Sequence, residues 1–121
     1  MRIATHLLIA CLLVLPAVTG CATSDYGRIT NKMADYEVQA AKDKQELDGA
    51  TDKATKIACL TRLIRNAELQ LKIARRINPE SNPQYRSGKM TLEASRADKE
   101  KRVKELEDRL ADYQKQRDAL S

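Results

Sequence analysis

The chain is poor in the residues that catalysis and metal binding use most. It has one histidine, His6, and no Trp or Phe, and its four aromatic residues are all Tyr. Histidine is the commonest general acid–base and a frequent member of nucleophilic triads and zinc sites, so its absence after position 6 argues against these classes of site. The sequence also lacks a glycine-rich phosphate loop. We therefore expect a non-enzymatic protein with no metal and no cofactor.

Strand-forming patterns are equally scarce. Aromatic residues make up 3% of the chain and charged residues 32%, with four glycines and three prolines. No segment alternates β-branched or aromatic residues with polar ones, as a half-buried strand would. After the first 20 residues the chain is rich in Ala, Glu, Lys, Leu, Arg, Gln and Asp, a composition typical of long helices and coiled coils. The sequence predicts an all-α fold.

The N-terminus carries a short apolar run between a charged start and a cysteine. Arg2 precedes the apolar residues 7–15, Pro16 ends the run, and Val18-Thr19-Gly20-Cys21 follows. Nine apolar residues cannot span a hydrocarbon core of ~30 Å as a helix. A charged start, a short apolar middle and small residues at the exit are typical of a cleaved export signal. We expect residues 1–20 to be removed.

The four residues from Val18 to Cys21 resemble the lipobox of bacterial lipoproteins. This resemblance implies that Cys21 becomes the first mature residue, that residues 21–24 form a lipidated N-terminus, and that acyl chains such as palmitate hold the protein in a membrane. In enterobacterial lipoproteins an Asp after the acylated cysteine favours the inner membrane. Ala22 stands there in this chain, which implies the outer membrane. We expect the protein on the periplasmic face of that membrane.

The expected helical, acylated architecture is also similar to that of small helical envelope lipoproteins such as the murein lipoprotein. That family ends in a lysine that attaches covalently to peptidoglycan. This chain ends in Asp118-Ala119-Leu120-Ser121, so covalent attachment is not expected.

Apolar residues recur at helical spacing over most of the mature chain. From Ile29 to Ile57 they follow a 4-3-4 pattern interrupted by Asp43, and after a short shift they resume from Leu60 to Ala74. The pattern predicts a helix over 25–77, a turn over 78–83 at its two prolines, and a second helix over 84–120. We favour a continuous first helix despite Gly49, the alternative being a bend or break there.

Two long helices joined by a short turn form an antiparallel hairpin or coiled coil. Pairing outward from the turn leaves residues 22–40 without a partner, as a stalk. The segment from Ile57 to Ile77 is apolar on more than one side, which requires more than one neighbour. Because a lone hairpin buries little surface, we expect it to form homo-oligomers.

Basic residues concentrate between Arg62 and Lys89. Seven basic and two acidic residues give this segment a net charge of +5, and the rest of the mature chain sums to −1. In a hairpin this cluster lies at the turn, farthest from the lipid. It would attract peptidoglycan carboxylates, anionic lipid or an acidic envelope protein, whereas nucleic acid is not expected in this compartment. The alternative is a solvated surface that keeps the protein soluble. The seven are Arg62, Arg65, Lys72, Arg75, Arg76, Arg86 and Lys89.

Cys59 is the one cysteine left after signal cleavage and acylation. A free cysteine is commonly a small buried apolar residue. An odd cysteine in an exported protein also suggests an intermolecular disulfide. Both interpretations stay open at this stage.

These features predict a membrane-anchored envelope lipoprotein that acts as a structural spacer or adaptor through its basic turn. The alternative is an accessory lipoprotein of a secretion, transport, or conjugation and entry-exclusion system. Such a protein would bind one defined protein partner through apolar residues of the first helix, among them Leu69 and Ile73.

Overall fold

A computed structural model describes residues 25–121 of the chain; the predicted signal peptide (1–20) and the predicted lipidation site Cys21 lie outside these residues. Over the described range the fold is all-α. Three long helices, α2 (Asp25–Gly49), α3 (Lys53–Ala74) and α5 (Leu92–Leu120), account for most of it. A 3-10 turn, η1 (Pro79–Ser81), and a single helical turn, α4 (Pro83–Arg86), lie between α3 and α5. The predicted all-α class is confirmed.

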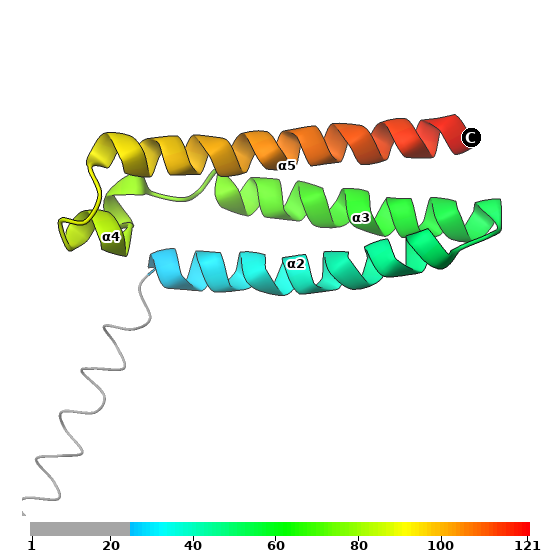
Figure 1. The fold of residues 1–121 in the computed structure, drawn as a ribbon, viewed down its shortest axis with the longest axis horizontal. Helices are drawn as coiled ribbons and strands as arrows, with labels where there is room; N and C mark the ends of the chain where they lie inside the picture. The colour runs from blue at the N-terminus through cyan, green and yellow to red at the C-terminus, as the bar shows by residue number, and fades with distance from the viewer. Residues whose placement is uncertain (1–24) are drawn as a thin grey trace, which may run out of the picture.

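The three long helices lie side by side, with α3 between α2 and α5 and antiparallel to both (Figure 1). Each outer helix packs mainly on α3. The chain therefore runs the length of the bundle three times, instead of the two passes that a hairpin would make.

The predicted continuous helix over 25–77 is wrong, because the chain reverses between Gly49 and Lys53. Glycine inside a helix costs about 1 kcal/mol relative to alanine, which weakens the helix at Gly49. Asp52 then starts a new helix: its carboxylate accepts hydrogen bonds from the Thr55 backbone N–H at 2.9 Å and the Thr55 hydroxyl at 2.8 Å. A side-chain acceptor at this position satisfies one of the free N–H groups of the new helix. Gly49 and the Asp52 cap thus favour a break between the two helices, although the apolar spacing continues across it.

The expectation that residues 22–40 form an unpartnered stalk is wrong for the residues that the structure describes. Met33 and Ala40 of α2 are buried, as is Asp43 on the same face. Met33 joins a cluster with Leu71 of α3 and Leu106 of α5, so all three long helices meet at this point. The inward face of α2 follows the predicted spacing, but the surface that covers it belongs to the same chain.

The connection between α3 and α5 is longer than the predicted turn over 78–83. The side chain of Asn78 caps η1, and that of Asn82 caps α4, each directly before a proline at the start of the element. Gly88 has φ +78°, a conformation that L side chains rarely adopt, and α5 begins only at Leu92, capped by Thr91. The predicted helix over 84–120 is thus shortened, because these caps and Gly88 end each short element.

The middle position of α3 explains why its apolar residues cover more than one face. A helix between two neighbours must bury two sides, and the prediction of more than one neighbour is correct. The neighbours are α2 and α5, so this surface does not itself require a second copy of the chain. The buried apolar residues from α3 and its C-terminal extension are Cys59, Leu60, Leu63, Ile64, Ala67, Leu71, Ala74 and Ile77.

Candidate anionic-partner interface

The end of the bundle that carries the 75–91 connection also carries the start of α2 (Figure 1). A hairpin would have placed this connection farthest from the N-terminus. Because the chain reverses at Gly49, α2 runs back along α3 and Asp25 lies beside the connection. The prediction that the basic turn lies at the opposite end of the molecule from the start of the first helix is therefore wrong.

Arg62 is not part of this end. Its side chain is exposed, and its guanidinium bonds Asp43 at 3.2 Å and Glu46 at 2.6 Å, both on α2. The hydrogen bond to Asp43, whose side chain is buried, raises the pKa of Arg62 above its ordinary value. Arg62 thus joins α2 to α3, which gives it a structural role.

Arg75, directly after α3, and Arg65, within α3, differ in whether they make an ion pair. Arg75 makes a long ion pair of 3.5 Å with Glu107 of α5, and both side chains are more than half exposed. An exposed pair of this kind is weak and leaves Arg75 available to other anions. Arg65 is exposed near the middle of α3, away from the connection.

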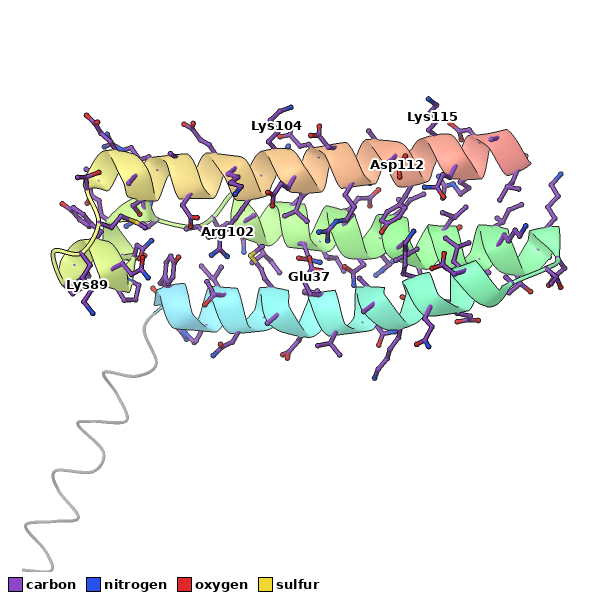
Figure 2. The ribbon with its side chains drawn as sticks, viewed as in Figure 1. Glu37, Lys89, Arg102, Lys104, Asp112 and Lys115 are labelled. Atoms are coloured by element: carbon purple, nitrogen blue, oxygen red, sulfur yellow. The ribbon has the colours of Figure 1, made fainter. Side chains whose placement is uncertain are left out.

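Four of the seven basic residues form the centre of the candidate interface. Lys72, Arg76, Arg86 and Lys89 are exposed, and none makes an ion pair within 4.0 Å among residues 25–121. Figure 2 shows Lys89 at this end, below the start of α5 and opposite the end that bears Lys115. Their charge is therefore directed to solvent.

The structure adds basic residues that the sequence analysis missed: Arg28 and Lys32 from α2, and Arg96 from α5. We define the basic end as residues 25–32 and 72–96, which hold eight basic and three acidic residues, a net charge of +5. The opposite end, residues 41–62 and 112–121, has a net charge of only +1. The signal that would have found Arg28 and Lys32 was the alternative of a break at Gly49, which brings α2 back to the turn.

A hollow of about 560 Å³ opens at the basic end between the start of α2, the end of α3 and η1. Arg28, Lys32 and Arg76 line it, and Ile29 and Ile73 provide apolar surface. Asp25 lies at the same hollow and forms an ion pair with Arg28. Even with this pair, the lining carries more positive than negative charge and combines cationic with aliphatic groups.

A second groove, of about 400 Å³, runs between α2 and α5. Its charges are largely paired within the chain: Arg109 bonds Glu37 at 2.6 Å across the groove, and Arg102 bonds Asp98 at 3.3 Å. Figure 2 shows Glu37 and Arg102 on these facing helices. This groove therefore attracts an anion less strongly than the basic end does.

Cys59 is fully buried in α3, with an exposed fraction of 0%. Its sulfur accepts a hydrogen bond from the Arg62 guanidinium at 3.4 Å. A disulfide between two copies would require the helices to separate. The interpretation of Cys59 as a small buried residue agrees with this position.

The described residues contain no group of three or more His, Cys, Asp or Glu side chains arranged to hold a metal ion. Within that same range, none of the helices is both long and apolar enough to cross a bilayer.

Comparison with models of protein families, with curated proteins and with solved structures gives no significant match to this chain. Functional inference therefore depends on its own residues and their arrangement.

Proposed function

We propose that this chain is a non-enzymatic envelope lipoprotein, anchored through acyl chains on Cys21, whose helical bundle serves as a spacer or adaptor. The basic end contacts an anionic partner of the envelope. The proposal combines the lipobox-like residues Val18 to Cys21 with the charge distribution of the bundle.

The observation that carries the proposal is the concentration of net positive charge at one end. The basic end has a net charge of +5, whereas the opposite end has only +1. Lys72, Arg76, Arg86 and Lys89 of the basic end are exposed and make no ion pair among the described residues. Concentrated cationic charge at one end of a stable bundle favours an anionic surface as partner.

The alternative, a single protein partner bound through the apolar residues of the first predicted helix, has less support. Leu63, Leu71 and Ala74 are buried within the bundle and unavailable to a partner. Leu69 and Ile73 are half-buried, and Ile73 packs against the same core cluster as Met33.

Photo-crosslinking in cells tests the proposal. A photoreactive residue at Gln84, exposed at the basic end, is compared with one at Lys115, exposed at the opposite end. We expect adducts to an anionic envelope component from position 84, fewer from position 115, and loss of the position-84 adducts when Arg76 and Lys89 are both changed to Glu. Equal adducts from both positions would contradict a role for the basic end.

The anchor is tested separately. Cys21→Ser is expected to remove the acyl mass from the N-terminal peptide and to release the protein from the membrane fraction. An unmodified Cys21 in the mature wild-type protein would refute lipidation, whatever the crosslinking result.

A further inference from the structure

We infer that the basic end binds the phosphate groups of anionic phospholipids in the same bilayer that holds the acyl chains, so that the bundle stands on the membrane by this end. The inference rests on the proposed lipid anchor at Cys21 and specifies which anionic partner the basic end meets.

The first argument is distance. Four peptide units separate Cys21 from Asp25, the first residue of α2, and they reach at most about 14 Å when fully extended. Helix α2 has 25 residues and is about 37 Å long at 1.5 Å per residue. An acyl chain on Cys21 therefore keeps the start of α2 close to the headgroups, whereas the Gly49 end can lie several times farther away.

The second argument is the position of the charge. The basic end has a net charge of +5 and includes the start of α2, so its cationic residues come near the headgroups when the anchor is inserted. Electrostatic attraction to a membrane falls off within a Debye length of about 8 Å at physiological ionic strength. In a bundle that stands on this end, charges at the Gly49 end lie beyond this range. The basic end then gains most from an anionic bilayer, because it carries the larger net positive charge.

The third argument is the chemistry of the hollow. Arg28, Lys32 and Arg76 line a space of about 560 Å³ together with Asp25, which is paired with Arg28. The outer parts of the half-buried Ile29 and Ile73 add aliphatic surface to it. Guanidinium and ammonium groups bind phosphate oxygens, with Arg able to do so through two N–H donors. The aliphatic surface suits the glycerol and upper acyl region of a lipid. This combination fits a phospholipid headgroup better than a cell-wall carboxylate.

Energy transfer to the membrane surface tests which end stands on it. The full chain, purified with its acyl groups and with Cys59→Ala as background, carries a donor dye on Ser87→Cys at the basic end or on Thr51→Cys at the other; both native residues are exposed. Each protein is reconstituted into vesicles of phosphatidylcholine alone or with phosphatidylglycerol, with an acceptor on a small fraction of the headgroups. The Förster distance of the dye pair is chosen to be shorter than the length of the bundle.

We expect strong transfer from position 87, increased by phosphatidylglycerol and reduced by high salt, and weak transfer from position 51 with either lipid. Lys89→Glu is expected to lower the phosphatidylglycerol-dependent increase in energy transfer, and Arg76→Glu to lower it further. Each substitution should shift the equilibrium between the bundle standing on the membrane and the bundle away from it by roughly tenfold. The matched control Lys115→Glu, at the far end, should leave it unchanged (Figure 2).

Transfer from position 87 that is the same with and without phosphatidylglycerol would overturn the inference, as would a phosphatidylglycerol-dependent increase at position 51. Circular dichroism of each variant identifies loss of helix, and the exposed positions of Lys89 and Lys115 make unfolding unexpected. The acyl mass on Cys21 is measured on the same samples. An acylated protein without the lipid-dependent response refutes only the seating on the membrane, whereas a non-acylated protein refutes the anchor.

Discussion

Replacing Met33 by Ala measures directly whether α2 packs in the bundle. Met33 is only 7% exposed and contacts the cluster where α2, α3 and α5 meet. Removing the outer atoms of a buried Met loses their transfer free energy and leaves a cavity, which together cost 2–5 kcal/mol in well-packed cores. Because Met33 keeps slight exposure and lies on an outer helix, we expect a loss of roughly 2–4 kcal/mol in the free energy of unfolding.

This loss is large for a domain of this size. Single domains have unfolding free energies of about 5–15 kcal/mol, and 1 kcal/mol shifts the midpoint by roughly 4–8 °C in a domain of 60–100 residues. Met33→Ala should therefore lower Tm by about 8–32 °C. Thermal and urea unfolding followed by circular dichroism at the helical minimum would measure both quantities.

Val38→Ala provides the control on the same helix. Val38 is 59% exposed, so its truncation should change stability by no more than about 0.5 kcal/mol. In a hairpin with an unpartnered stalk, neither substitution would matter. Equal, small effects at Met33 and Val38 would refute the packing of α2 on the other helices and, with it, the placement of the basic end beside the N-terminus.

Three further predictions concern the break, its cap and the buried thiol. At Gly49 an added Cβ would meet open space and φ is not positive, so Gly49→Ala should stabilise the protein by about 0.4–1 kcal/mol in urea unfolding. Gly88 has φ +78°, so Gly88→Ala should destabilise the protein by about 1 kcal/mol. The opposite order of the two effects would show that the break at Gly49 requires glycine. Hydrogen bonds from the Thr55 hydroxyl and backbone N–H lower the pKa of Asp52 below its ordinary value of 3.8. Its stabilising contribution is therefore present above pH 3.8 and is lost as the pH falls through the lower folded value, so the urea midpoint of the wild type should drop over this acid range more steeply than that of Asp52→Asn. Finally, the Cys59 thiol should react with a maleimide only as fast as the bundle opens, and rapidly in denaturant; immediate reaction of the native protein would show that α3 is not enclosed.

The sequence correctly predicted the buried face of a helix where apolar residues repeat at helical spacing. Ile64, Ala67 and Leu71 repeat at helical spacing and are buried, and Leu106 of the last helix is buried as well. The unusually broad apolar surface between 57 and 77 also implied more than one neighbour. These features depend on helical periodicity, which any packed arrangement of helices must respect.

The ends of the elements were less predictable. A single glycine at position 49 costs about 1 kcal/mol, an amount that packing can supply or override, so the pattern alone could not decide between a weak turn and a reversal. Asp52, with Thr55 three residues later, was the local signal for a new helix. Likewise, Asn78 and Asn82 before their prolines mark two short elements where the sequence analysis expected one turn.

The sequence by itself determined that this protein is helical, that apolar residues such as Ile64 and Leu71 face inward, and that basic residues gather around the connection before the last helix. Only the tertiary structure decided at which end of the molecule those residues lie. The reason is that the reversal at residues 50–52 is fixed by α2 burying Met33 against Leu71 of α3 and Leu106 of α5, residues far apart in the chain. That reversal brings Arg28 and Lys32 to Arg76, and so places the basic end beside the start of the first helix.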